Sequence, residues 1–347
     1  MRRITSSHVK TRRLYYLYKI SEIIQNEGAR FKLQLRNKLI NFSDLNHNLF
    51  DRHIDSTGEI TTSKTSFERY LDLSKDFELT SLIENKIINI VDGFTLSLIN
   101  YENMRPYSLS NSLKIFFLKQ IIEKDYDYFI TLFKMYEKNV VLNYDNFIDV
   151  LYNHLSDNYD VIEFLDDINR IKEWKSPDDN FKYNVFHPRQ SWFIDLNIIS
   201  SKSKDSNKGL ILKSNFSHII NKLINTNIND LDDYLNNRYY HDVSLFLYRD
   251  DEKFINSNDD FKINYVIKYL NKIKNKLNIK DRISNRFLLD YIPINSLLYE
   301  NIIIEKNELK EVFTQISKNY PEYRYRPVIE INNKGRRIDS GYISFIR

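Results

Sequence analysis

Within the last thirty residues, apolar and charged side chains alternate with a period of two, a pattern that an extended strand places on two opposite faces. The alternation runs from Tyr323 to Ile331, and residues 336–346 return rich in β-branched and aromatic side chains. Between the runs lies Asn332-Asn333-Lys334-Gly335. Because Asn and Gly tolerate the positive φ angles of tight turns, the segment predicts a β-hairpin.

This hairpin concentrates positive charge and aromatic rings. Guanidinium groups bind phosphate oxygens in pairs and read base edges, and tyrosines between them can stack on unpaired bases. The pattern favours a nucleic-acid-binding element, and the alternative is an amphipathic hairpin whose arginine face is merely solvated. The candidate residues are Tyr323, Arg324, Tyr325, Arg326, Lys334, Arg336 and Arg337.

Charge is distributed unevenly along the chain. The whole chain carries a net charge of +4, whereas residues 1–38 carry +8 and residues 318–347 carry +4, which leaves −8 for the span between them. Two basic ends around an acidic middle are typical of proteins that contact nucleic acid, because phosphates attract the basic segments. The N-terminal candidates for this contact are Arg2, Arg3, Lys10, Arg12 and Arg13, and the alternative is a solvated tail.

Composition narrows the chemistry. The chain has no cysteine and six glycines, and it lacks a Gly-rich phosphate loop, a Gly-x-Ser-x-Gly elbow and paired histidines. We therefore expect no cofactor and no metal, and we lean away from an enzyme. A metal-dependent nuclease stays as an alternative on loose carboxylate clusters, namely Glu300 with Glu305-Lys306 and residues 250–253.

Helical spacing dominates the middle of the chain. Helices are expected over residues 65–73, from Ser108 or Ser110 to about Lys124, and over the acidic residues 145–174. Asp92-Gly93, between two β-rich runs, predicts a two-residue hairpin, and Ser176–Asn180 predicts a linker. Trp174 and Trp192 are expected to anchor the core.

A helix followed by a hairpin recurs near residues 65–98, 188–213 and 307–346. In the middle copy, Pro188 can start the helix, and the basic residues are Arg189, Lys202, Lys204 and Lys208. This repetition resembles the winged-helix superfamily, in which a helix-turn-helix precedes a hairpin wing. The resemblance implies duplex DNA binding, with a helix in the major groove and wings along the backbone.

The predicted fold class is α+β and predominantly α-helical, with tandem winged-helix-like modules and short β-hairpins joined by helical packing. The predicted domains are residues 1–105, 106–176, 177–280 and 281–347. The predicted function is non-enzymatic binding of double-stranded DNA by a subunit of a larger complex. Scarce alanine and glycine suggest an AT-rich bacterial or phage genome, and the setting includes antiviral defence, restriction, mobile elements or chromosome maintenance.

The second hypothesis is an adaptor whose acidic helical centre docks a catalytic protein partner. No stretch approaches 18 uncharged apolar residues and the N-terminus lacks a signal-peptide pattern, so a cytoplasmic protein without membrane contact is expected.

Overall fold

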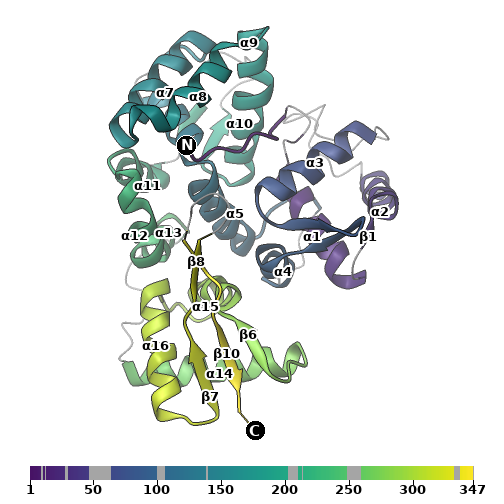
Figure 1. Cartoon of the computed structure of the whole chain (residues 1–347), viewed down its shortest axis with the longest axis vertical. Helices are drawn as coiled ribbons and strands as arrows, with labels where there is room; N and C mark the ends of the chain where they lie inside the picture. Colours follow the sequence, from purple (N-terminus) through teal and green to yellow (C-terminus); the bar gives the residue numbers. More distant parts are fainter. Residues whose placement is uncertain are drawn as a thin grey trace. The chain divides into compact units, whose positions relative to one another are not determined.

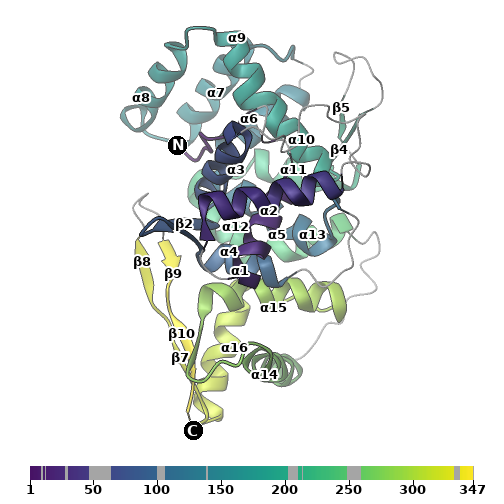
Figure 2. The same cartoon turned by 90° about the vertical axis from the view of Figure 1, so that its right-hand side faces the viewer.

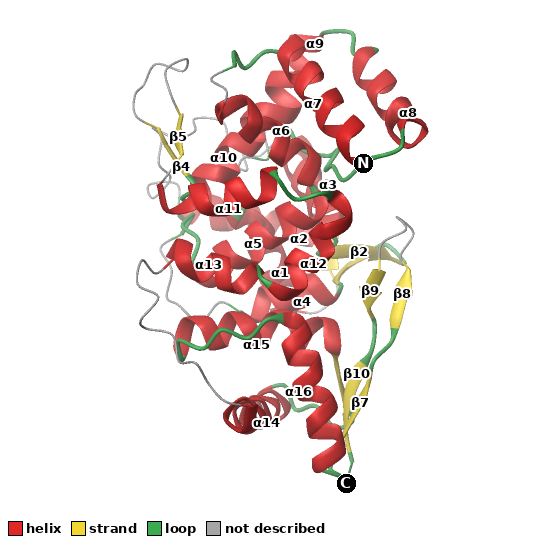
Figure 3. Ribbon diagram, turned by 90° about the vertical axis from the view of Figure 1, so that its left-hand side faces the viewer, coloured by secondary structure: helices red, strands yellow, loops and turns green. Residues whose placement is uncertain are grey.

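The computed structural model describes residues 1–8, 11, 13–27, 30–46, 64–99, 106–137, 140–201, 210–212, 214–247, 259–331 and 337–346. The chain forms two compact units, residues 1–232 and 233–347 (Figure 1). Their boundary falls in helix α12 (Leu231–Asn237), inside the segment 177–280 that the sequence predicts as one domain. Helices predominate and the described strands are short and antiparallel, which confirms the predicted α+β, mainly helical class (Figure 3).

Unit 1 begins with helices around a small sheet of order β1-β3-β2 (Figure 2). The turn between β2 and β3 is Glu84-Asn85, whose φ angles of 47° and 65° are those of a type I′ hairpin turn. Asn suits this conformation because its short polar side chain tolerates positive φ. The elements are α1 (Tyr15–Glu27), β1 (Arg30–Phe31), α2 (Lys32–Leu45), α3 (Lys64–Asp76), β2 (Thr80–Ile83), β3 (Lys86–Asn89) and α4 (Val91–Leu98).

The hairpin predicted at Asp92-Gly93 is wrong, because both residues lie in the first turn of α4. A Cβ on Gly93 would lie 2.0 Å from the carbonyl oxygen of Leu79, so glycine lets the helix approach the backbone before β2. The buried Asp92 carboxylate accepts hydrogen bonds from Lys124 Nζ at 3.1 Å and Gln120 Nε2 at 3.3 Å. The Asp-Gly pair therefore serves helix packing rather than a turn.

The rest of unit 1 is a helical array with one further hairpin. Ser110 Oγ caps α5 by accepting from Leu113 N, as predicted, and Asn143 caps α7 in the same way. The predicted linker at 176–180 is wrong, because Pro177 occupies the first turn of α9. The elements are α5 (Asn111–Lys124), α6 (Tyr126–Glu137), α7 (Tyr144–Asn158), α8 (Val161–Lys172), α9 (Pro177–Asn180), the π-helix η2 (Phe181–Phe186), α10 (His187–Asp195), β4 (Ile199–Ser201), β5 (Leu210–Leu212), α11 (Ser214–Ile224) and the 3₁₀ turn η3 (Ile228–Asp230).

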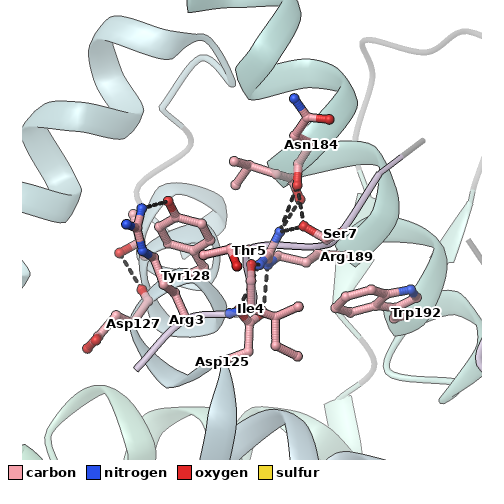
Figure 4. A network of polar contacts seen from close by, with 12 residues as sticks. Arg3, Ile4, Thr5, Ser7, Asp125, Asp127, Tyr128, Asn184, Arg189 and Trp192 are labelled. Carbon is pink, nitrogen blue, oxygen red and sulfur yellow. Dashed lines mark hydrogen bonds and ion pairs between the residues drawn. The ribbon is translucent and has the colours of Figure 1, made fainter. Parts of the chain in front are cut away.

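The core of unit 1 is organised around Arg189, whose side chain is 0% exposed (Figure 4). Its Nε donates to Asp125 Oδ2 at 2.6 Å and its Nη2 to Asp125 Oδ1 at 2.7 Å. The remaining N–H groups donate to Ile4 O at 3.0 Å, Ser7 Oγ at 3.0 Å and Val185 O at 3.1 Å. All five guanidinium N–H groups thus have acceptors inside the protein.

The π-helix next to Arg189 has a local cause in the sequence. In a regular α-helix the carbonyl of Asn184 would accept from residue 188, but Pro188 has no N–H. The Asn184 carbonyl instead accepts from Arg189 Nη1 at 3.2 Å and from the Ser7 hydroxyl. The proline and the buried arginine therefore widen the helix together.

Residues 259–345 of unit 2 have the order helix, strand, helix, helix, strand, strand when the separate β8-β9 pair is set aside, with sheet order β6-β10-β7. Residues 15–89 of unit 1 have the same order, and there too the last strand lies between the other two. The described elements are α13 (Tyr239–Leu247), α14 (Asp259–Lys276), β6 (Arg282–Ser284), α15 (Asn285–Tyr299), α16 (Lys306–Asn319), β7 (Tyr323–Arg326), β8 (Ile329–Ile331), β9 (Arg337–Asp339) and β10 (Tyr342–Phe345). None of the helices in the described ranges has the length and apolarity needed to cross a bilayer.

The predicted C-terminal hairpin is confirmed. Strand β7 pairs with β10, with Arg326 opposite Tyr342, and β8 pairs with β9, with Ile331 opposite Arg337. The predicted turn at 332–335 lies outside the described residues.

Helices α13 and α16 are tied together by Glu305, the N-cap residue of α16. Its carboxylate forms a capping box with Glu308 and accepts from Tyr240 N at 3.2 Å and His241 N at 2.7 Å. Burial raises the pKa of Glu305 to about 7, Asp242 and Glu308 add to the rise, and the two amides oppose it.

The first prediction concerns Arg189. Arg189→Met leaves the Asp125 carboxylate buried without its counter-charge, and we expect a loss of about 3–5 kcal/mol in the free energy of unfolding, measured by urea denaturation. Lys75→Met is the control, because it removes an exposed ion pair with Asp72 and should cost less than about 1 kcal/mol. Equal losses in the two variants would contradict the central role of Arg189.

The second prediction concerns pH. The folded-state pKa of Glu305 lies above its ordinary value of 4.5, so the folded protein holds more protons and loses stability as the pH rises from about 4.5 to about 7. Glu305→Gln removes this titration. In urea unfolding at pH 4.5 and pH 8, wild type should lose up to about 3 kcal/mol relative to the variant. A difference that stays constant with pH would contradict the assignment.

Candidate nucleic-acid interface

Strand alternation gives the β6-β10-β7 sheet a buried face and an exposed face. Tyr323, Ile343 and Phe345 point inward and are at most 7% exposed. Their neighbours Arg324 and Arg326 point outward and are exposed. The exposed face is defined here as the arginine face and comprises Arg282, Ser284, Arg324, Arg326, Tyr342 and Ser344.

Tyr342 lies between two guanidinium groups at the centre of the arginine face. Its ring centroid is 5.3 Å from Arg282 Cζ and 5.9 Å from Arg326 Cζ. Both distances are within cation–π range, so the ring holds the arginines in place without neutralising them. Among the described residues, no carboxylate forms an ion pair with Arg282, Arg324 or Arg326. Three positive charges are therefore available to an anionic ligand.

Helix α16 lies beside β7 (Figure 3). Its outer side carries a polar stripe. Glu311, Thr314 and Lys318 are exposed and follow helical spacing, with Asn307 one turn before them. The opposite face of α16 packs inward through Leu309, Val312, Phe313 and Ile316. This stripe therefore carries one acidic, one basic and two uncharged hydrogen-bonding side chains.

Tyr323 and Tyr325, predicted to stack on bases, face the helices of unit 2 instead. Tyr323 donates from its hydroxyl to Asn271 Oδ1 at 2.9 Å, and the Tyr325 ring lies 5.5 Å from that of Phe313. Burial and Asp339 raise the pKa of Tyr325 to about 12. Because Tyr and Arg alternate, the two tyrosines lie on the face opposite to Arg324 and Arg326.

The other predicted hairpin residues are only partly described. Lys334 and Arg336 lie outside the described residues, and for Arg337 only the backbone pairing in β9 is described. Beyond Pro327, strand β8 is exposed along its whole length.

The N-terminal arginines lie within unit 1 and form ion pairs there. Arg3 Nη2 lies 2.7 Å from Asp167, Arg13 Nη1 2.6 Å from Asp195, and Arg2 Nη2 3.2 Å from Asp232. The side chains of Arg2, Arg3 and Arg13 are at most 15% exposed, so their placement does not support a nucleic-acid-binding arm. The predicted residues Lys10 and Arg12 lie outside the described residues.

The middle hairpin also differs from its prediction. The structure forms the expected helix and strand pair, α10 and β4-β5. However, Arg189 is a buried core residue, and its guanidinium cannot reach a nucleic acid while unit 1 is folded. Lys202, Lys204 and Lys208 lie outside the described residues.

Four of the six residues of the arginine face, namely Arg282, Ser284, Tyr342 and Ser344, are not among those predicted from the sequence. Tyr342 could have been found, because a turn centred on Lys334 places it opposite Arg326. Arg282 carried no local signal, because its strand joins the sheet from more than 35 residues before β7. Only the tertiary fold brings it beside Tyr342.

Of the residues considered for a nuclease, Glu305 and Lys306 make structural contacts, whereas Glu300 is the exposed C-cap residue of α15. Glu305 caps α16, and Lys306 pairs with Asp290 at 3.3 Å. In the part of the chain that the structure describes, no group of three His, Asp or Glu residues is arranged to hold a metal ion. Residues 250–253 lie outside that part.

No protein-family model matches this chain, and no curated protein or solved structure matches it at a significant level.

The arginine face depends on close backbone contact at Gly341. A Cβ there would lie 2.2 Å from Arg326 O and 2.7 Å from Val328 N. We expect Gly341→Ala to destabilise unit 2 by at least ~2 kcal/mol in urea unfolding, because it forces β7 and β10 apart. Ser340→Ala is the matched control. It removes a buried hydroxyl that has no hydrogen-bond partner among the described residues, so it should be neutral or slightly stabilising. Equal effects would show that the contact at Gly341 is unimportant.

Proposed function

We propose that the chain is a non-enzymatic DNA-binding subunit of a larger assembly, and that unit 2 is a winged-helix module. In this proposal α16 is the recognition helix and the β7-β10 hairpin is the wing. The observation that carries it is the arginine face, where Arg282 and Arg326 flank the Tyr342 ring, Arg324 lies on the same face, and none of the three forms an ion pair within the described residues. The order of elements and the central position of β10 in the sheet are those of winged helices, which supports this assignment.

The arginine face would contact the DNA backbone. Guanidinium groups bind phosphate oxygens bidentately, and each neutralised phosphate releases counterions. Such contacts position a protein on the duplex but carry no sequence information. Sequence would be read by the polar stripe of α16, where Asn307 and Thr314 can hydrogen-bond to base edges.

The related arrangement in unit 1 fits another role. The outer face of the β1-β3-β2 sheet carries the apolar side chains of Phe31 on β1 and Ile83 on β2, which are 49% and 52% exposed. Both strands pair with β3. Lys86 is the positively charged residue described on this face, and the described residues there include no cluster of arginines like that of unit 2. DNA binding is therefore assigned to unit 2.

The adaptor hypothesis has its own supporting observation in α8. Val161 and Ile162 are 51% and 88% exposed beside the acidic Glu163 and Asp166. An apolar patch among acids is typical of a surface that a basic protein partner covers. This patch lies in unit 1, so a protein partner is compatible with DNA binding by unit 2.

The third prediction tests DNA binding. The variant Arg282→Ala/Arg324→Ala/Arg326→Ala should bind a mixed-sequence duplex at least tenfold more weakly than wild type. The plot of log affinity against log salt should lose about 2.7 from its slope, the value for three phosphate contacts. Fluorescence anisotropy across a salt series measures both quantities.

A charge-matched control separates a specific surface from general attraction. Lys268→Ala/Lys272→Ala/Lys276→Ala removes the same charge from the exposed side of α14. We expect it to keep most of the affinity and slope. If both triple variants lose affinity equally, or if wild type binds DNA no better than a protein of similar charge, the proposal is wrong.

A further inference from the structure

Unit 1 contains a cleft of about 380 Å³ that the proposed DNA interface does not use. It is bounded by the N-terminal segment, α3, the C-terminal part of α8 and the π-helix η2. The residues that line it include Arg3, Arg69, Arg170, Trp174, Asn180 and Asn184. Three of the lining residues, Arg3 of the N-terminal segment, Tyr128 and Asn184, are labelled in Figure 4.

The charge of the cleft lining is entirely positive. Three arginines line it and no carboxylate does. Arg3 already pairs with Asp167 and donates to the Tyr128 hydroxyl at 3.1 Å, which fixes its side chain. Arg69 and Arg170 are exposed and form no ion pair within the described residues. Two guanidinium groups are thus available for an anion, and they approach the cleft from α3 and α8.

The cleft also offers a flat aromatic surface. Trp174 was expected in the core, but it is only half-buried, lies 6.0 Å from the Tyr144 ring and lines the cleft. An indole that reaches a cleft is the surface on which a planar base stacks. Asn180 and Asn184 stand beside it, one helical turn apart, with Asn184 Nδ2 donating to Asn180 Oδ1 at 2.9 Å. Their amides can pair with ring nitrogens and exocyclic groups.

The position of Asn184 has a structural reason. It lies in η2, and π-helical turns are frequently found at functional sites. Pro188 and Arg189 create this widened turn, so the buried network also shapes one wall of the cleft. At about 380 Å³ the cleft is near the lower end of ligand pockets, which suits one nucleotide rather than a dinucleotide.

We propose that this cleft binds a nucleoside monophosphate, with the phosphate between Arg69 and Arg170 and the base on Trp174. Two kinds of ligand present such a phosphate and base, namely a free nucleotide and the 5′-phosphorylated end of a DNA strand. The site lies in unit 1 and does not depend on the arginine face of unit 2.

The fourth prediction uses the full chain and isothermal titration with AMP and GMP. At least one of these nucleotides should bind ten times or more tightly than adenosine, guanosine or inorganic phosphate. Only a nucleotide has both a phosphate for the two arginines and a base for Trp174. Arg170→Ala should weaken binding at least tenfold through the lost charge-assisted hydrogen bonds. Trp174→Leu should weaken it at least fivefold through lost stacking.

Lys172→Ala is the matched control, because Lys172 is an exposed cation of the same helix that stacks on Tyr152 rather than lining the cleft. It should bind the nucleotide as wild type does. Equal losses in Arg170→Ala and Lys172→Ala would overturn the proposal, as would inorganic phosphate binding as tightly as both nucleotides, or no binding of either nucleotide at millimolar concentration.

Competition distinguishes the two sources. A short 5′-phosphorylated strand that displaces the nucleotide, while its 5′-hydroxyl counterpart does not, identifies a strand end as a ligand. If neither strand displaces the nucleotide, the free nucleotide is identified as the ligand. Nucleotide binding should persist in the Arg282/Arg324/Arg326 triple variant, so the failure of one proposal is separate from the failure of the other.

Discussion

The buried pair of Arg189 and Asp125 is the interaction on which unit 1 depends. A guanidinium taken out of water costs several kcal/mol unless each N–H finds an acceptor, and here the acceptors come from three distant segments. Asp125 ends α5, Ile4 and Ser7 belong to the N-terminal segment, and the π-helix supplies its carbonyls. Asp125 also accepts from Ile4 N at 2.8 Å. The pair therefore fixes the first residues of the chain in the interior, where simple hydrophobic packing would allow many registers.

The contacts of the N-terminal segment inside unit 1 change how the charge distribution along the sequence is interpreted. The basic N-terminus and the acidic middle suggest a surface for phosphates, yet the structure brings them together. Arg3 of the N-terminus and Asp167 of α8 form an ion pair, and Arg13 pairs with the buried Asp195. Charge summed along a sequence cannot show this, because it does not indicate which opposite charges will meet. Of the two basic ends, only the C-terminal one has described arginines that are exposed and without ion pairs.

Local signals in the sequence predicted the elements well and their partners poorly. The C-terminal hairpin followed from a period of two and a turn rich in Asn and Gly, and the helix after Ser110 followed from its cap and apolar spacing. Asp92-Gly93 failed because a tight turn and a close helix contact both select glycine, and only the position of Leu79 O separates them. Tyr323 and Tyr325 were assigned with the arginines although strand geometry puts them on the opposite face. Arg282 was beyond prediction, since α15, α16 and β7 separate it from Tyr342 in the sequence and only the tertiary fold brings the two side chains together.

Residues 15–89 of unit 1 and the helices and three-stranded sheet of residues 259–345 in unit 2 share one order of elements but differ in their surfaces. In residues 15–89 the outer strand positions are apolar or mixed, whereas in unit 2 the corresponding sheet carries arginines around a tyrosine. The sheet order and the inward apolar residues are what the fold requires, so the outward positions are free to vary with the ligand. Cation–π contact suits such a surface because it orders the long arginine side chains, reducing the entropy lost on binding, and leaves their charge intact. A carboxylate in place of Tyr342 would order them equally well but would cancel the attraction for phosphate. In the proposed DNA-binding role, the aromatic ring of Tyr342 therefore keeps the arginines both ordered and charged.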